Sequence, residues 1–108
     1  MIQRKENRVP IQSRAVLASN AINEGRLVDV SKGGCAIEGA MGPNNGDSVQ
    51  LRFGIPDGGT VHIPLAIVRW VSGRRFGIEF IRTKESDMQK LSSFIRSMAE
   101  QEEPIFWV

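Results

Sequence analysis

Apolar and polar residues alternate along most of the middle of the chain, and glycine-rich segments cut this alternation into short runs. A period of two is typical of β-strands that bury one face. The breaks include Asn44-Asn45-Gly46-Asp47 and Pro56-Asp57-Gly58-Gly59, whose residue types favour turns. The pattern predicts six strands: Ser13–Ala18, Arg26–Val30, Cys35–Glu38, Ser48–Phe53, Thr60–Trp70 and Arg74–Ile81.

The connections between these predicted strands are only a few residues long. Short connections favour antiparallel neighbours, because a parallel crossover needs about a dozen or more residues. Six short strands without intervening helices fit a closed barrel better than an open sheet, since closure leaves no exposed edge. We therefore expect a mainly all-β fold, a small six-stranded antiparallel β-barrel.

A helical period replaces the alternation after Ile81. Ser86 is a candidate N-cap with Gln89 three residues later, and the helix is expected to end before Pro104. The apolar residues of this helix fall on one face: Met88, Leu91, Phe94, Ile95 and Met98. Four apolar residues, 105–108, then follow, and they either pack on the barrel or form a partner surface.

The length of the chain, 108 residues, fits one domain. A chain of this size buries roughly 60–70% of its unfolded surface and needs no disulfides to fold. We expect a single domain over residues 1–108, with these parts: a flexible N-terminal arm at 1–12, the barrel at 13–81, one C-terminal α-helix at 84–103 and the apolar tail at 104–108.

Cysteine usage and hydropathy favour a cytoplasmic setting. The only cysteine, Cys35, cannot form an internal disulfide and is expected to be a small core residue. The sequence shows neither a signal peptide nor an apolar run approaching about 18 residues. We therefore expect a soluble protein in a reducing, cytoplasmic setting, without membrane insertion.

The formal charge of +2 is too small to mark a general binder of nucleic acids or membranes. Its distribution says more. Residues 1–14 carry four cations against one anion, whereas residues 84–103 carry three cations against five anions. The N-terminal end is therefore the part of the chain that attracts anions.

Arg4 and Arg8 form the first of two short motifs, Arg-x-x-x-Arg. A guanidinium can bind a phosphate or the O6/N7 edge of guanine with two parallel hydrogen bonds. By itself the pattern also fits a solvated, charged chain terminus. Two guanidinium groups in one segment nevertheless suit a polyanionic ligand.

The second motif, Asp29 to Gly34, reads Asp-x-Ser-x-x-Gly. Asp29 and Ser31 share one face of the predicted strand. An ionised carboxylate only accepts hydrogen bonds, which matches the N1–H and 2-amino donors of guanine, and Ser31 can bind a phosphate or sugar oxygen. Gly33 and Gly34 permit a positive φ and a close approach of a ligand. The same residues also fit an ordinary hairpin whose turn Asp29 and Ser31 organise.

In this order and spacing, the two motifs resemble the signature of the PilZ domain family, which binds the bacterial second messenger cyclic di-GMP (c-di-GMP). The resemblance extends over most of the chain, including Val68-Arg69-Trp70 and Arg75-Phe76-Gly77-Ile78-Glu79-Phe80. It implies an arm that wraps over the ligand and a strand that holds the other side. The residues to which it assigns ligand contacts are Arg4, Arg8, Asp29, Ser31 and Gly34.

Several neighbouring positions are candidates for accessory contacts: Gln3, Lys5, Lys32, Gly33 and Trp70. In the family the residue before the first motif arginine influences how many ligand molecules bind, and Gln3 leaves that number open. Both lysines suit solvent as well as a ligand, because their ammonium groups are strongly hydrated. Trp70 either presents its face to the ligand or belongs to the core, the commoner place for a large aromatic in a late strand.

Catalytic and metal-binding constellations are not evident in the sequence. His62 stands alone in an apolar run, and the single cysteine is distant, so neither a zinc site nor a nucleophilic triad is expected. No Walker-type loop or dinucleotide fingerprint is present. We expect a structural role for His62, no enzymatic activity, and no cofactor or metal beside the ligand c-di-GMP.

The leading hypothesis is a receptor whose arm closes over c-di-GMP and so signals to an unidentified downstream protein. The alternative is a PilZ-like scaffold that acts through protein contacts without a ligand. A barrel that binds single-stranded nucleic acid is disfavoured, because such a surface needs exposed aromatics among cations and the aromatics here fall mostly at predicted core positions. We expect a monomer or a weak homodimer.

Overall fold

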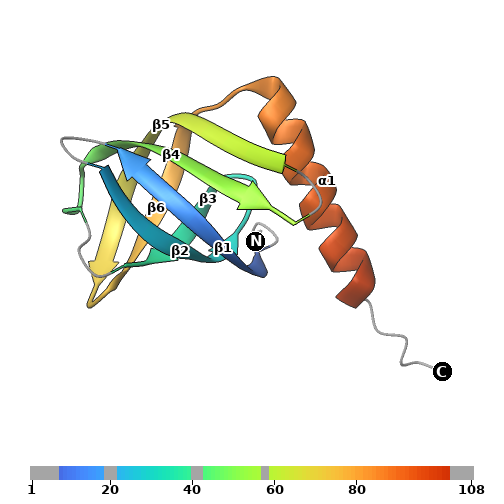
Figure 1. Cartoon of the computed structure of the whole chain (residues 1–108), viewed down its shortest axis with the longest axis horizontal. Coiled ribbons are helices and arrows are strands. Elements are labelled where there is room, and N and C mark those ends of the chain that lie inside the picture. The colour runs from blue at the N-terminus through green and yellow to red at the C-terminus, as the bar shows by residue number, and fades with distance from the viewer. Residues whose placement is uncertain (1–7, 19–21, 40–42, 57–58, 103–108) are drawn as a thin grey trace, which may run out of the picture.

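The computed structural model describes residues 8–18, 22–39, 43–56 and 59–102. Within these ranges the chain forms six strands and one helix, in the arrangement of Figure 1. The elements are β1 (Val9–Ala18), β2 (Ile22–Val30), β3 (Gly34–Glu38), β4 (Ser48–Ile55), β5 (Gly59–Ser72), β6 (Arg75–Arg82) and α1 (Glu85–Glu102).

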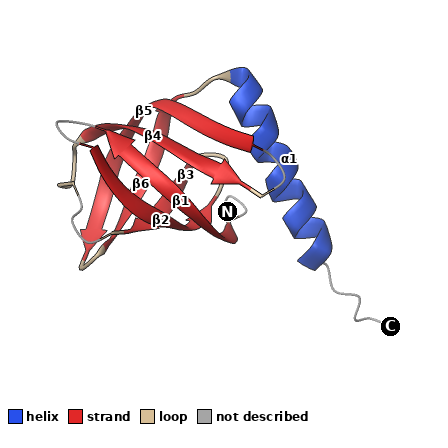
Figure 2. Ribbon diagram, in the orientation of Figure 1, coloured by secondary structure: helices blue, strands red, loops and turns tan. Residues whose placement is uncertain are grey.

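The strands close into a barrel in the order β1-β2-β3-β6-β5-β4. Every neighbouring pair is antiparallel, and β1 closes the sheet on β4 through pairs such as Ala15 with Phe53. Helix α1 lies beside one end of the barrel (Figure 2). This architecture confirms the closed antiparallel barrel with one C-terminal helix that the alternating pattern predicted.

The core consists of the inward-facing residues of the strands. Along β4, from Ser48 to Ile55, buried positions follow more exposed ones with a period of two. The largest fully buried side chains come from four strands: Phe53, Phe76, Leu27, Ile37 and Leu51. Cys35 is also fully buried, and this burial raises the pKa of its thiol, so Cys35 is a core residue as expected.

Strand β1 begins at Val9, four residues before the predicted start at Ser13. Val9 and Ile11 continue the inward face and are buried. Pro10 pairs with Asp29 at the beginning of the strand, where a missing N–H group is tolerated. Residues 9–12 therefore belong to the barrel and not to the predicted arm. The rest of that arm, residues 1–7, and the predicted tail, residues 104–108, lie outside the described residues.

Strand β2 is also longer than predicted, since it begins at Ile22 instead of Arg26. Its first residue pairs with Ala18, the last residue of β1, so the two strands form a hairpin. Gly25, the residue before the predicted start, pairs with Ala15 inside the ladder. Pairing with a neighbour has here outweighed the weak strand preference of glycine.

Helix α1 packs its apolar face on the barrel. Leu91 and Ile95 are buried, and Met88, Phe94 and Met98 pack partly buried against the core, as the helical period predicted. The predicted cap at Ser86 is wrong. The carbonyl of Lys84 already accepts the Met88 N–H at 2.9 Å, so Ser86 lies inside the first turn.

Asp87 links the first turn of α1 to β5 through a hydrogen bond. Its Oδ2 accepts the backbone N–H of His62 at 3.2 Å, and its Oδ1 lies 3.3 Å from the ammonium of Lys90. Burial raises the pKa of Asp87, but these two contacts lower it more, so the pKa lies below its ordinary value. The Nε2 atom of His62 lies 3.2 Å from Oε1 of Gln50.

Replacing Asp87 with Ala is expected to lower the free energy of unfolding by about 1–3 kcal/mol at neutral pH. Because the folded-state pKa is lowered, the carboxylate stabilises the fold above its unfolded pKa of about 3.9, and the contribution is lost as the pH falls through the folded pKa. Urea denaturation at pH about 7 and about 2.5 should therefore show a smaller difference in unfolding free energy between Asp87→Ala and the unmodified chain at the acid pH. Glu85→Ala, at an exposed position of the same turn, is the control. An equal loss of unfolding free energy at both pH values would contradict a stabilising role of the ionised Asp87 carboxylate.

Within the described ranges, α1 is not apolar enough to cross a membrane. In the same part of the chain, His, Cys, Asp and Glu side chains form no group of three or more that could hold a metal ion. The candidate chemistry described below lies in arginine, carboxylate, hydroxyl and aromatic groups.

Candidate functional site

Arg8 lies where the two sequence motifs meet. Its Nη1 donates to the Ser31 Oγ at 3.4 Å, and its Nη2 lies 3.3 Å from the Asp29 Oδ1. Arg8 was predicted to sit on the movable arm, but it directly precedes β1 and these contacts tie it to the barrel. The remaining N-terminal candidates lie outside the described residues: Gln3, Arg4 and Lys5.

The Asp29 carboxylate has an acceptor oxygen that its surroundings satisfy poorly. Oδ1 is closed to solvent and accepts no hydrogen bond from the described residues. The Arg8 guanidinium, 3.3 Å away, neutralises it as an ion pair without the alignment of a hydrogen bond. A closed acceptor of this kind is costly, and the adjacent positive charge of Arg8 offsets part of that cost.

A β-bulge in β2 turns Asp29 away from the core. Leu27 and Asp29 pair with consecutive residues of β3, so Val28 is an extra residue in β2. In a regular strand Asp29 would share the inward face of Leu27, which is fully buried. The bulge instead places the carboxylate on the outer side, where it contacts Arg8.

Ser31 organises the turn that follows β2. Its backbone N–H donates to the Gly34 carbonyl at 2.8 Å, its hydroxyl donates to the same carbonyl at 3.3 Å, and that hydroxyl accepts the Gly33 N–H at 3.3 Å. The residue is fully buried. Of the two roles that its sequence position allowed, the turn-forming one is present, and the hydroxyl also holds the guanidinium of Arg8.

Gly33 and Gly34 do not adopt the positive φ that glycine permits at these positions. Among the described residues, the glycines with positive φ are Gly46, Gly59 and Gly73. Gly34 is required for a different reason, because a Cβ atom there would lie 2.3 Å from the carbonyl oxygen of Ile78 on β6. The two strands approach too closely for a side chain at this point, so Gly34 is a packing requirement of the barrel.

A shallow pocket of about 150 Å³ lies beside Arg8 and Gly34. Arg69 and Trp70 of β5 and Glu79 of β6 form other parts of its wall. Of the accessory candidates, Gly33 and Trp70 line this pocket, whereas Lys32 is exposed on the adjoining turn. The second motif and the C-terminal part of β5, far apart in sequence, thus share one concave surface.

Trp70 belongs to this pocket and not to the core. It is 43% exposed, and its ring packs directly on Gly77, where a Cβ atom would overlap the indole nitrogen. Val68 and Trp70 pair with consecutive residues of β6, so Arg69 is an extra residue in β5. In a regular strand Trp70 would point inward with Val68, and the bulge turns it outward instead. The core alternative for Trp70 is therefore wrong.

Arg69 and Glu79 were not assigned to the site from the sequence. The Arg69 Nε donates to the Glu79 Oε1 at 2.6 Å, and both side chains are about half exposed. The one available signal is the position of Arg69 directly before Trp70, where a charge interrupts a long apolar run. The bulge in β5 is the structural counterpart of that interruption.

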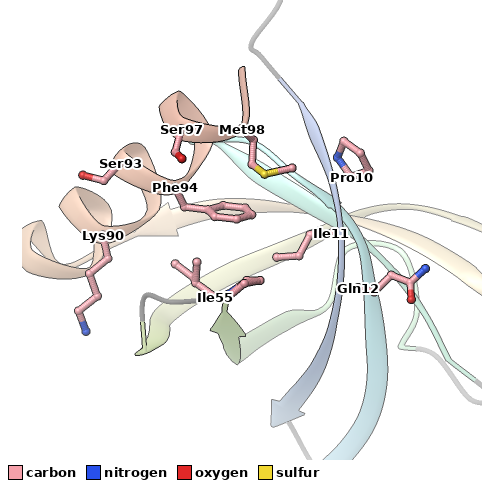
Figure 3. Close-up of a pocket in the computed structure, with 10 residues that line it drawn as sticks. Pro10, Ile11, Gln12, Ile55, Lys90, Ser93, Phe94, Ser97 and Met98 are labelled. Atoms are coloured by element: carbon pink, nitrogen blue, oxygen red, sulfur yellow. The ribbon is translucent and has the colours of Figure 1, made fainter. Parts of the chain in front are cut away.

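A larger groove of about 570 Å³ lies between α1 and the barrel (Figure 3). Ile11 of β1 and Ile55 of β4 face it together with Phe94 and Met98 of α1, and Lys90 lines one side. None of the described motif residues borders it. The groove is mainly apolar and offers no guanidinium, so it does not match the chemistry of the two motifs.

Comparison with known protein families supports the resemblance seen in the sequence. The family model described as "PilZ domain" matches residues 2–97, which include both motifs and most of the helix. Among curated protein sequences, none matches the chain significantly.

Solved structures with the same fold are similar at low sequence identity. The Bacillus subtilis inhibitor of motility (MotI/DgrA) has a TM-score of 0.85 and 16% identity over 96% of this chain and 55% of that chain. YcgR from Escherichia coli, in complex with c-di-GMP, has a TM-score of 0.76 and 20% identity over 92% of this chain and 47% of that chain. The PilZ domain of CeSA from a cellulose synthesizing bacterium has a TM-score of 0.62 and 20% identity over 89% of this chain and 98% of that chain. The chain thus spans about half the length of the first two proteins, and these likenesses show the fold alone.

Proposed function

The chain belongs to the PilZ domain family, and from this premise we propose that it is a receptor for c-di-GMP. The observation that carries the proposal is the convergence of the Arg8 guanidinium with Asp29 and Ser31 at the beginning of β1. These three side chains come from both motifs. A similar fold, that of E. coli YcgR, is solved in complex with c-di-GMP, which supports the choice of ligand.

Arg8 binds a phosphodiester or the O6/N7 edge of a guanine with charge-assisted hydrogen bonds. Its side chain is 44% exposed, so a ligand can reach it. Asp29 and Ser31 hold the guanidinium before the ligand arrives, which reduces the conformational entropy lost on binding. In this proposal Arg4 supplies a second guanidinium from the segment that precedes β1.

Asp29, whose side chain is 32% exposed, accepts hydrogen bonds from the N1–H and 2-amino groups of guanine. The exposed face of Trp70 stacks on the same base. Ser31 acts through Arg8, because it is fully buried. Gly34, with Gly33, shapes the pocket wall at a point where a side chain does not fit. Lys32 contributes charge at the rim.

The pocket beside Arg8, about 150 Å³ in volume, is too small for a whole cyclic dinucleotide. We place the rest of the ligand under residues 1–7, which include Gln3, Arg4 and Lys5. Closure of this segment over the ligand creates the surface that a downstream protein recognises. Ligand binding, and not turnover, is the output of the receptor.

Isothermal titration calorimetry of the purified chain with c-di-GMP tests the proposal. We expect saturable binding at micromolar or lower ligand concentration, with a stoichiometry of one or two. GMP is the control ligand, and we expect it to bind at least about tenfold more weakly, because a second linked nucleotide adds contacts without a second association cost. Absence of heat and of thermal stabilisation with c-di-GMP would refute the assignment.

A scaffold that acts without a ligand is the alternative function from the sequence. No observation on the described residues favours it over the receptor, because Arg8, Asp29 and Ser31 meet in an arrangement suited to ligand binding. The predicted contact surface of such a scaffold includes residues 104–108, which lie outside the described ranges. The same titration separates the two functions.

A further inference from the structure

Arg69 reaches the pocket of Arg8 because it is the extra residue of the bulge in β5. A bulge leaves one residue of the ladder unpaired, and bulges are enriched next to binding sites, where they redirect side chains. Here the bulge at Arg69 places two residues in the pocket wall, and the bulge at Val28 places Asp29 against Arg8, which lines the same pocket. The bulge at Val28 exposes Asp29, and the bulge at Arg69 exposes both Arg69 and Trp70.

The Arg69 guanidinium is only partly used by the described residues. Its Nε donates to the Glu79 Oε1 at 2.6 Å, and no described residue accepts a hydrogen bond from its two terminal nitrogens. A guanidinium carries five N–H donors, so the terminal nitrogens keep four of them available. These donors match two oxygens of a phosphodiester or the O6/N7 edge of guanine.

Glu79 stands in the middle of the sheet that forms the pocket wall. It pairs with Gly34 of β3 on one side and with Ile67 of β5 on the other. Its carboxylate neutralises Arg69, as Asp29 neutralises Arg8. The described part of the pocket therefore holds two arginines and the carboxylate of Glu79, which places a negative charge where an anionic ligand would bind.

From this geometry we propose that Arg69 is a further ligand-binding residue of the site and that Glu79 is a built-in counter-ion that lowers the affinity. This inference rests on the proposed function and specifies how its site is tuned. The pair lies between side chains that are 54% and 51% exposed, and such pairs exchange partners easily. An arriving ligand takes the Arg69 donors, while the charge of Glu79 opposes it and keeps binding reversible.

Titration of c-di-GMP into single and double variants tests this inference. Glu79→Gln keeps an acceptor oxygen for Arg69 but loses the charge, and we expect it to tighten binding by about two- to fivefold. Arg69→Ala should weaken binding by about tenfold, at the low end for one charge-assisted contact because Arg69 is half exposed. In the double variant the tightening by Glu79→Gln should be smaller than in the single variant, since Glu79 acts on Arg69.

Glu38→Gln is the matched control, because it removes the same charge from another exposed pair between β3 and β6, with Arg75 at 3.8 Å. We expect it to leave the affinity within about twofold. Equal tightening in Glu38→Gln, weaker binding in Glu79→Gln, or unchanged affinity in Arg69→Ala overturns the inference. Thermal melting of each variant verifies folding, and Arg69→Gln replaces Arg69→Ala if the alanine variant melts early.

Binding by the unmodified chain separates this inference from the proposed function. If the unmodified chain binds c-di-GMP and the Arg69 variant binds equally well, only the role of Arg69 and Glu79 is refuted. If neither the unmodified chain nor Glu79→Gln binds, the proposed function is refuted and this inference with it.

Discussion

Replacing Arg8 with alanine is expected to weaken c-di-GMP binding by about 10- to 150-fold, the loss of charge-assisted hydrogen bonds that contribute about 1.5–3 kcal/mol. The change removes the guanidinium that contacts both Asp29 and Ser31. It also leaves the Asp29 carboxylate without the cation that neutralises it, next to an anionic ligand. Loss of attraction and gain of repulsion act in the same direction, and isothermal titration measures their sum.

Arg14→Ala is the matched control for Arg8→Ala. Arg14 lies in β1, the strand that Arg8 directly precedes, and forms an exposed pair with Glu24 at 3.4 Å, outside the pocket. The control removes the same charge, so we expect a change in affinity below about twofold. Arg8→Lys should give an intermediate affinity, because lysine keeps the charge but cannot form the two parallel hydrogen bonds of a guanidinium. Similar affinities in the Arg8 and Arg14 alanine variants would show that the ligand binds elsewhere.

Replacing Gly34 with alanine is expected to destabilise the barrel by about 1–3 kcal/mol even without ligand. The new Cβ atom would lie 2.3 Å from the backbone oxygen of Ile78, which cannot swing aside as a side chain can. The two strands must separate at the pair of Gly34 with Glu79, in the wall of the barrel. For a domain of this size we expect the melting temperature to fall by at least about 4 °C, measured by circular dichroism.

Gly54→Ala is the control for this substitution, because Gly54 is also a strand glycine without positive φ. Its Cβ atom would lie 3.6 Å from the Ser13 Oγ, an ordinary contact distance. We expect a change within about 0.5 kcal/mol. A Gly34→Ala protein that melts like the unmodified chain but no longer binds c-di-GMP would contradict the packing role and assign Gly34 to direct ligand contact.

The barrel and the helix could be predicted from the sequence because burial of one face leaves a local period. The alternation along β4 and the helical spacing of Leu91 and Ile95 are each visible within a few residues. Short connections then limited the neighbours to antiparallel pairs, and the closed order of strands confirms this reasoning. The starts of β1 and β2 were misplaced, because Pro10 and Gly25 look like breaks and are accommodated only through pairing with other strands.

The geometry of the candidate site was less predictable, because it depends on strand register. The bulges at Val28 and Arg69 shift the alternation by one residue, and their positions follow from the pairing of β2 with β3 and of β5 with β6. Neither shift has a clear local pattern. For this reason the sequence left Trp70 open between core and ligand and did not assign Arg69 to the site.

By itself, the sequence determined the fold class, the helical face, and the candidate pair of motifs that contain Arg8, Asp29 and Ser31, because these are properties of residue type and short spacing. Only the tertiary structure decided that Arg8 is tied to the barrel, that Gly34 serves strand packing, and that Arg69, Trp70 and Glu79 share the pocket. Those facts depend on which strands pair and in what register, and closure of the barrel determines both.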